Sequence, residues 1–406
     1  MSTNNDTNTK NIKKTQPTIL GTKPSFINAQ LLISTGIPSL DTIIGGGLPI
    51  GTILLLEEDK YGNNAKTILK YFFAEGCVAK HNLFVASQDF PPDKFIADLP
   101  AVIGPDDKSA LPTGFSVVPT AGSAVPTPPQ SVRDADRMKI AWRYEHMKAN
   151  DSLASKSKNS KYNSDFGHYY DLTKTMDKNL IDRNKIFYWN DDIDNHGDKY
   201  RMGFKNNRYV DLLKNLQQKL KAGEFYVTDK PKLRNIMRIG IHRLGSRLWL
   251  NDDGDADDDD DDDDDDDRKD SGDLIRFLYC FRSLLRNCYA VGVITVPDIF
   301  EDDTIMKRIE NLSDTAIALE SFAGSSKETN PIFKDYHGLL HVKKLSAINT
   351  LASHCPESYD LAFKMRRKKF VIEILHLPPD FGDDDKNDDN KIIPGFGCGS
   401  SKLLDF

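Results

Sequence analysis

The sequence has little cysteine and no long apolar run. Its five cysteines contain no C-x-x-C pair: Cys77, Cys280, Cys288, Cys355 and Cys398. An odd, scattered set fits a reducing compartment better than a disulfide framework, so we expect free thiols. No stretch approaches the roughly 18 apolar residues that span a membrane, and the N-terminal residues MSTNNDTNTKNIKKTQP lack the apolar core of a secretion signal. We therefore expect a soluble intracellular protein with no membrane partner.

Acidic residues outnumber basic residues in the whole chain, but the excess comes from a single segment. The 406 residues carry a formal net charge of −7, but residues 252–267 contain fourteen aspartates. Without that tract the chain carries −7 + 14 = +7, which is a mildly basic body with an acidic insertion. Densely packed like charges repel and stay solvated, so the tract predicts a disordered loop, with a calcium-binding or RNA-mimicking role as the alternative. A basic body permits an acidic partner such as RNA.

Apolar patterning predicts strands that alternate with helices. Strands are predicted at 53–56, 83–86, 236–241, 291–296, 316–319, 339–342 and 370–375, and helices from 65 onward, at 209–221 and at 273–288, the last capped by Ser271 or Asp273. This alternation is typical of an α/β fold with a mainly parallel sheet covered by helices.

Residues 60–67, KYGNNAKT, follow the first of these strands and lead into a helix across a loop of about eight residues. A phosphate-binding loop reads G-x-x-x-x-G-K-[ST], in which glycines let backbone N–H groups approach the phosphates. Lys66 and Thr67 match the last two positions, whereas Lys60 and Ala65 replace both glycines and Gly62 is off register. Gly62, Lys66 and Thr67 are therefore candidates for a degenerate nucleotide site. The alternative is a relic turn with Lys66 as a solvated helix residue.

The strand at 236–241 continues as His242, Arg243 and Leu244, with no carboxylate. A phosphoryl-transfer site needs its metal held, so this absence argues against an enzyme. The histidines do not indicate a catalytic or metal site either. His337 and His341 are four apart in a strand-like segment, and His168 has no neighbouring nucleophile in sequence. We predict no metal site, and a hydrogen-bonded structural role for His168.

The segment STGIPSLDTIIGGGLPIGTILLLEED resembles the start of RecA-like ATPase domains. Further blocks run along the chain in order: MKIAWRYE, FGHYYDLTK, IGIHRLGSRLW, GSSKETNPIFKDYHGLLHV, DLAFKMRRKKFVIEILHLPPD and GCGSSKLLDF. Together they resemble the PAXNEB family of Elongator subunits. We predict one RecA-like domain at 28–375 with flexible insertions near 100–165 and 251–270, between a disordered tail at 1–27 and an acidic extension at 376–406.

The family resemblance also implies a function that the individual residues do not show. It implies a hexameric ring with two related RecA-like subunits, Elongator proteins 5 and 6, which associates with the larger Elongator subunits. One of those larger subunits is catalytic. The assembly would modify the wobble uridine of tRNA with a 5-carboxymethyl-type group, in the cytoplasm and nucleus. This chain would bind tRNA without catalysing the reaction and would require no cofactor, although ATP binding in the ring is possible. The alternative is an active RecA-type ATPase.

Basic side chains supply the candidate RNA contacts. The run at 364–369 precedes an apolar strand and is the strongest basic patch in the sequence, and two further arginines lie four apart on one predicted helix. The candidates are Arg282, Arg286, Lys364, Arg366, Arg367 and Lys368. A solvated or structural face is the alternative for each.

Overall fold

The computed structural model describes residues 19–28, 30–103, 166–190, 204, 206–249, 266–300, 303–366 and 368–376, with backbone alone for 266–271 and 303. The chain divides into two compact units, Met1–Leu375 and His376–Phe406, and the description that follows concerns the first. The predicted insertions, the MKIAWRYE block, Arg367 and the C-terminal extension lie wholly or largely outside the described residues. Their domain limits stay predictions.

A nine-stranded sheet forms the centre of this unit, in the order β14-β13-β12-β11-β4-β10-β9-β5-β8. The strands from β11 to β8 in this order run parallel, and β12, β13 and β14 continue the sheet antiparallel. Their bounds are β4 Ile53–Glu57, β5 Asn82–Ser87, β8 Ile186–Trp189, β9 Met237–His242, β10 Ala290–Val296, β11 Thr315–Ser321, β12 Gly338–Lys344, β13 Leu361–Met365 and β14 Phe370–Ile374. The predicted α/β class and the mainly parallel sheet covered by helices are confirmed.

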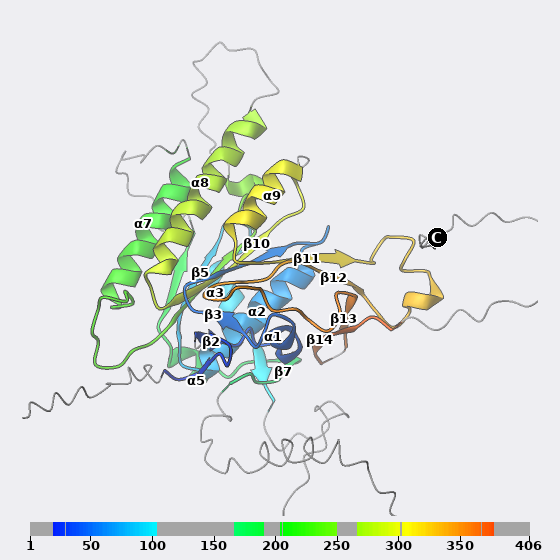
Figure 1. Ribbon diagram of the computed structural model, residues 1–406, viewed down its shortest axis with the longest axis horizontal. Helices are drawn as coiled ribbons and strands as arrows, with labels where there is room; N and C mark the ends of the chain where they lie inside the picture. Colours follow the sequence, from blue (N-terminus) through cyan, green and yellow to red (C-terminus); the bar gives the residue numbers. More distant parts are fainter. Residues whose placement is uncertain are drawn as a thin grey trace, which may run out of the picture. The chain divides into compact units, whose positions relative to one another are not determined.

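Helices cover both faces of this sheet (Figure 1). One face carries α2 with α1 and α3, and the other carries α7, α8 and α9. The helices are α1 Pro38–Ile43, α2 Asn63–Val78, α3 Pro92–Ala97, α5 Lys178–Asp182, α7 Asn207–Ala222, α8 Asp266–Arg286 and α9 Asp303–Leu312, and two short 3-10 turns are Arg247–Trp249 and Pro331–Phe333.

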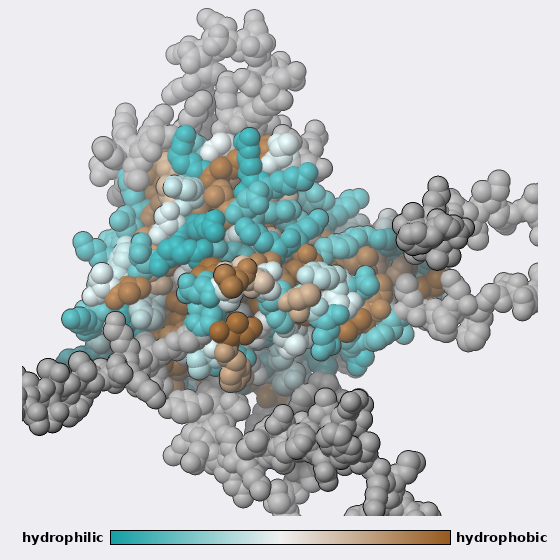
Figure 2. All heavy atoms as spheres, in the orientation of Figure 1, coloured by the Kyte–Doolittle hydropathy of each residue, from teal (hydrophilic) through white to brown (hydrophobic). Residues whose placement is uncertain are grey.

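The sequence produces this layering because β4 is apolar on both faces. Leu54 and Leu56 pack into the cluster under α2, whereas Ile53 and Leu55 pack into the cluster under α7 and α8. A strand buried on both faces reads as a continuous apolar run, and β10 is likewise buried along its whole length. Figure 2 shows hydrophilic residues over most of one face of the unit, with apolar residues in small groups between them.

Two small sheets lie beside the large one. β1 Thr22–Pro24, β2 Leu31–Ile33 and β3 Leu48–Pro49 form one, and β6 Pro100–Val102 pairs with β7 Tyr170–Thr175 in the other. The predicted tail at 1–27 is therefore too long. Thr22–Pro24 is ordered because its backbone pairs with β2, and Ile19 just before it is buried.

The predicted start of the third helix is also wrong. α8 begins at Asp266, seven residues before Asp273, so neither Ser271 nor Asp273 is its cap. The Asp273 side chain instead accepts hydrogen bonds from the Asn206 N–H, at 2.7 Å, and from Arg276, at 2.9 Å. The helix begins N-terminal to the apolar stretch from which it was predicted. Apolar periodicity could not predict these first residues because they are polar. No helix of the described part is long and apolar enough to cross a membrane.

Candidate functional site

The loop between β4 and α2 is where a RecA-like domain would bind phosphate. It runs from Glu58 to Gly62, which is shorter than the predicted eight residues because α2 begins at Asn63. Gly62 is the cap residue of α2 with a φ of 67°, in the left-handed region. A Cβ at this position would lie 2.7 Å from Oε2 of Glu58. Gly62 therefore lets a buried carboxylate approach the helix start.

Lys66 and Thr67 lie on the first turns of α2, but their side chains are already engaged. The Lys66 ammonium lies 3.6 Å from the centroid of the Phe90 ring. Lys66 is half-buried, and burial, followed by the charge of Lys70, lowers its pKa. The Thr67 hydroxyl donates to the Asn63 carbonyl, at 2.9 Å. The structure thus brings all three predicted residues together without an open phosphate loop.

Glu58 occupies the space beside this loop. It is 4% exposed and accepts a 2.6 Å hydrogen bond from the Thr295 hydroxyl. Its second oxygen forms an ion pair with Nε of Arg243, at 3.2 Å. Burial raises the pKa of Glu58 to about 7, although Thr295 and Arg243 oppose the rise. The phosphate position is therefore lined by a carboxyl group that is held in place by two neighbouring strands.

Arg243 joins this carboxyl group to a second one. It follows β9 with a φ of 53°, and its guanidinium donates to Asp89 at 3.2 Å. Asp89 also accepts a 2.6 Å hydrogen bond from the Ser246 hydroxyl. Sequence reasoning missed both acids because it considered the end of β9 alone. The signal was present, since Glu58 follows β4 directly and Asp89 lies two residues after β5, and the carboxyl ends of parallel strands meet at one edge.

His242 lies where the metal-holding carboxylate of an active ATPase is expected. Burial, followed by the charges of Lys66 and Arg243, lowers its pKa to about 3. Its Nδ1 lies 3.1 Å from the Ser87 hydroxyl. A buried neutral imidazole neither neutralises phosphate nor replaces a carboxylate around magnesium. The described residues contain no group of three or more acidic, histidine or cysteine side chains that could hold a metal.

This edge is electrostatically unfavourable for a nucleotide while its carboxyl groups are ionised, although Glu58, with a pKa of about 7, takes up a proton readily near neutral pH. A phosphate charge about 4 Å from an ionised carboxylate costs roughly 4 kcal/mol at an effective dielectric constant of about 20. Glu58 and Asp89 lie at the edge, and the cation between them, Arg243, is already shared by both. A bound triphosphate would have to displace or protonate these acids.

A cavity of about 350 Å³ lies at the end of β4 and is lined by both Glu57 and Glu58. Its acidic lining includes Glu57 and Glu310, and its basic lining includes Lys343. Burial and the neighbouring Glu310 raise the pKa of Glu57 to about 7. His341 lines the cavity and forms a 2.9 Å ion pair with Glu320.

The other histidine considered in the sequence is engaged elsewhere. Nδ1 of His337 accepts a hydrogen bond from the Met365 N–H at 3.2 Å. His337 and His341 are thus separately partnered and do not converge on one metal position.

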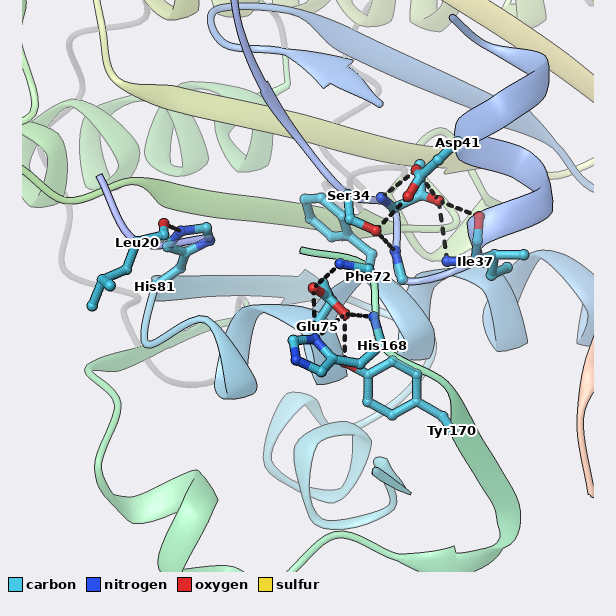
Figure 3. A network of polar contacts seen from close by, with 12 residues as sticks. Leu20, Ser34, Ile37, Asp41, Phe72, Glu75, His81, His168 and Tyr170 are labelled. Atoms are coloured by element: carbon cyan, nitrogen blue, oxygen red, sulfur yellow. Dashed lines mark hydrogen bonds and ion pairs between the residues drawn. The ribbon is translucent and has the colours of Figure 1, made fainter. Parts of the chain in front are cut away.

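A second polar cluster lies on the α2 side of the sheet (Figure 3). Glu75 of α2 accepts hydrogen bonds from the backbone N–H groups of Gly167 and His168, each at 3.1 Å, and from the Tyr170 hydroxyl at 2.6 Å. Nδ1 of His168 lies 3.1 Å from the same carboxylate. The predicted structural role of His168 is confirmed, because it ties the segment before β7 to the centre of the unit.

Arg238 of β9 is fully buried beside this cluster. Its Nε donates to Nδ1 of His81 at 3.0 Å, and one terminal nitrogen donates to the carbonyls of Ser34 and Phe72 at 2.8 and 3.0 Å. A buried guanidinium needs a nearby anion, and Glu75 is the largest electrostatic influence that offsets the burial of Arg238. This cluster therefore holds structural elements together and offers no open site.

The arginines predicted on α8 point to an internal partner. Arg282 donates to Asp314 at 3.1 Å, and Arg286 donates to the same carboxylate and to the Gly51 carbonyl, the latter at 2.7 Å. Asp314 is buried and also accepts from the Ile53 N–H at 2.9 Å. These two arginines fix the start of β4.

The basic run near β13 and β14 is partly neutralised too. Lys364 forms a 2.6 Å ion pair with Glu373, and Arg366 lies 3.8 Å from the same carboxylate. Lys368 is exposed, and its carbonyl accepts from the Leu172 N–H at 2.7 Å. Arg367 lies outside the described residues. The structure thus leaves Lys368 as the most available cation of this predicted group.

Comparison with known proteins gives a family match along nearly the whole chain. The model of the PAXNEB protein family matches residues 15–405. Three similar proteins are each named Elongator complex protein 4. The one from Danio rerio is 41% identical, with 91% of this chain and 88% of that protein covered. Those from Mus musculus and Homo sapiens are 40% and 38% identical, with 96% of this chain and 89% of each protein covered.

One solved structure matches most of this chain, but with low sequence identity and a low TM-score. It is a KaiC-like protein from Pyrococcus horikoshii OT3, which is 13% identical with a TM-score of 0.38, and the overlap covers 84% of this chain and 98% of that protein. So low a score supports no argument about function.

Proposed function

Because the chain belongs to the PAXNEB protein family, we propose that it is a non-catalytic, RecA-like subunit of the Elongator complex. The observation that carries this proposal is the family match from residue 15 to residue 405, which spans nearly all of this sequence. The name shared by the similar proteins is that of a complex member. Membership of the complex is thus the first part of the proposal.

The absence of catalysis in this subunit is the second part. Its support is the carboxyl group of Glu58 beside the shortened loop, together with His242 where the strand of an active ATPase ends in a carboxylate. Lys66 lies against Phe90 instead of facing an open loop. We propose that no cofactor is required. ATP binding would need a neighbouring subunit to supply missing groups, as arginines do in trans elsewhere.

The third part concerns assembly and substrate. We propose that the chain forms a hexameric ring with two related RecA-like subunits, Elongator proteins 5 and 6, which joins the larger subunits, the catalytic one among them. The ring would hold tRNA while its wobble uridine receives a 5-carboxymethyl-type group, in the cytoplasm and nucleus. The family resemblance is the support for this part.

Purification of the tagged full-length chain from its own cells tests the assembly. We expect the two RecA-like partners and the larger Elongator subunits in the eluate, and a six-subunit mass for the ring by native mass spectrometry. A tagged unrelated protein of similar net charge is the control. Recovery of the chain alone, or with partners outside Elongator, contradicts the proposal.

The tRNA role needs a separate measurement. Removal of the chain from cells should abolish the 5-carboxymethyl-type modification of wobble uridine, measured by nucleoside mass spectrometry of total tRNA. Restoring the wild-type chain should restore it, and so should Lys66→Ala if nucleotide chemistry at this subunit is dispensable. Rescue by wild type but not by Lys66→Ala would favour the alternative, an active ATPase.

A further inference from the structure

The amino-terminal edge of the sheet carries exposed lysine and arginine side chains that belong to none of the motifs described above. We define the basic edge as Lys80, Arg183, Lys185, Lys221, Lys230 and Lys232. All six are exposed. Among the described residues, the ion pairs found do not involve any of them. Their charges are therefore available to an outside partner.

Hydrogen bonds hold the segments of the basic edge together. The Asn235 side chain donates to the Lys80 carbonyl at 3.1 Å, so the turn before β5 meets the loop before β9. The Leu83 N–H donates to the Lys185 carbonyl at 2.9 Å, which places the start of β8 beside them. At the end of α7, the Lys219 ammonium lies 5.4 Å from the centroid of the Phe187 ring on β8. Figure 1 shows the end of α7, the loop after it and α5 on the same lower-left side.

The local charge is strongly positive. Segments 80–82, 177–185 and 219–236 contain nine lysines and arginines and four acidic residues, so their net charge is 9 − 4 = +5. Two of the acids are engaged locally, since Asp177 caps α5 and Asp229 accepts from the Tyr226 N–H at 3.0 Å. One base is fixed as well, because Arg234 donates to the Tyr226 carbonyl at 3.0 Å and stacks on Tyr289. Of the eight other basic residues, Lys219 lies over the Phe187 ring and Lys178 is not counted in the basic edge, and the remaining six are its members.

The aspartate tract is attached at the opposite end of the unit. It precedes α8, which runs from the carboxyl edge back to the amino edge before β10. The 21 residues of α8 span about 31 Å at roughly 1.5 Å per residue. The aspartate tract therefore joins the chain at the start of α8, and the basic edge lies near the end of the same helix. A polyanion is attracted to the amino edge of the sheet and repelled from its carboxyl edge.

We propose that the basic edge binds the phosphate backbone of a folded RNA, which would be tRNA if the proposed function above is right. Exposed lysines without fixed partners adapt to phosphates along a backbone, and such contacts position an RNA without reading its sequence. An acidic protein is the competing partner, since Val227 and Leu233 are exposed in the same loop. RNA is favoured because the edge has six free cations and few apolar side chains.

The test uses the Elongator complex purified with the tagged full-length chain. The edge variant carries Lys185→Glu, Lys230→Glu and Lys232→Glu. The matched control carries Lys60→Glu, Lys94→Glu and Lys334→Glu, which are three exposed lysines outside the basic edge with the same change of charge. Thermal unfolding verifies that both variants are folded.

Binding of tRNA, an unrelated RNA duplex and polyglutamate is measured across salt concentrations. For the edge variant we expect tRNA affinity to fall by about tenfold or more, and the slope of log affinity against log salt to become shallower by up to about 2 to 3 units. The control should change the slope by less than about one unit.

The outcomes separate this inference from the proposed function. If tRNA binds and both variants keep the wild-type slope, or both lose it equally, the basic edge is not the RNA contact, and the proposed function is untouched. If the edge variant loses the unrelated duplex as much as tRNA and cells without the chain keep normal wobble uridine, the edge binds RNA but the tRNA role is wrong. If the wild type binds polyglutamate and no RNA, the partner is an acidic protein and the inference is overturned.

Discussion

Replacing Glu75 with glutamine would remove the charge at the centre of the polar cluster under the sheet. Burial by itself raises the pKa of this carboxyl group, but the hydrogen bond and charge of His168, the charge of Arg238 and the Tyr170 hydroxyl together lower it to about 2. The ordinary value is 4.5. The ionised form is therefore stabilised by folding, and glutamine keeps the shape of the side chain without that charge.

The size of the effect follows from the lowering of the Glu75 pKa from 4.5 to about 2. At about 1.36 kcal/mol per unit, the charged carboxylate contributes about 3 kcal/mol to the free energy of unfolding. Because the folded pKa is the lower one, this contribution is fully present above pH 4.5 and is lost as the pH falls from 4.5 towards 2. Glu75→Gln should therefore cost about 3 kcal/mol at pH 7, while at pH 3 the difference from wild type should be smaller.

Urea unfolding of the full-length chain between pH 7 and pH 3 measures this directly. The matched control is Glu357→Gln, an exposed glutamate that makes none of the ion pairs found among the described residues. It should stay within about 0.5 kcal/mol of wild type at every pH. The reasoning is refuted if Glu75→Gln does the same at pH 7, or if its deficit does not shrink towards pH 3.

Three further changes test the candidate site and the acidic tract. Gly62→Ala should lower stability by about 1 to 2 kcal/mol, because the position is left-handed and the new Cβ would meet Glu58; Gly272→Ala, where a Cβ meets nothing, is its control in urea unfolding. The isolated chain should hydrolyse ATP no faster than Lys66→Ala, and activity lost in that variant would contradict the non-catalytic interpretation. Deletion of 252–265, which leaves α8 whole, should move the melting temperature by less than about 2 °C and leave partner recovery unchanged; a larger change in either would identify the tract as a contact surface.

Most of the sheet and the main helices could be predicted from the sequence. The apolar runs that predicted strands at 53–56, 83–86 and 291–296 lie in β4, β5 and β10, and the helix predicted at 209–221 is α7. These elements are buried on one or both faces, so their pattern depends on local sequence alone. The ends of elements were harder, as the early start of α8 and the strand β1 show, because their backbone pairing leaves no apolar pattern.

The sequence predicted where the candidate site lies, but not how its side chains are arranged. Glycine spacing and the match at Lys66 and Thr67 placed it after β4, and the missing carboxylate after β9 is the basis for the prediction of a non-catalytic subunit. The sequence could not show that Glu58 lies beside Arg243, or that Lys66 lies against Phe90, because each pair comes from different strands or loops. Proximity at a sheet edge is a property of strand order, which apolar patterning does not specify.

By itself, the sequence determined the α/β class, the family and the absence of an intact phosphate loop, because these depend on residue types in order along the chain. Only the tertiary structure decided which charges are free. Arg282 and Arg286 share an ion pair with Asp314, which lies on a distant segment, whereas Lys185, Lys230 and Lys232 are exposed and form no ion pair among the described residues. The physical reason is that the pairing of charges is a matter of distances of a few ångströms, and the fold sets these between residues that are far apart in sequence.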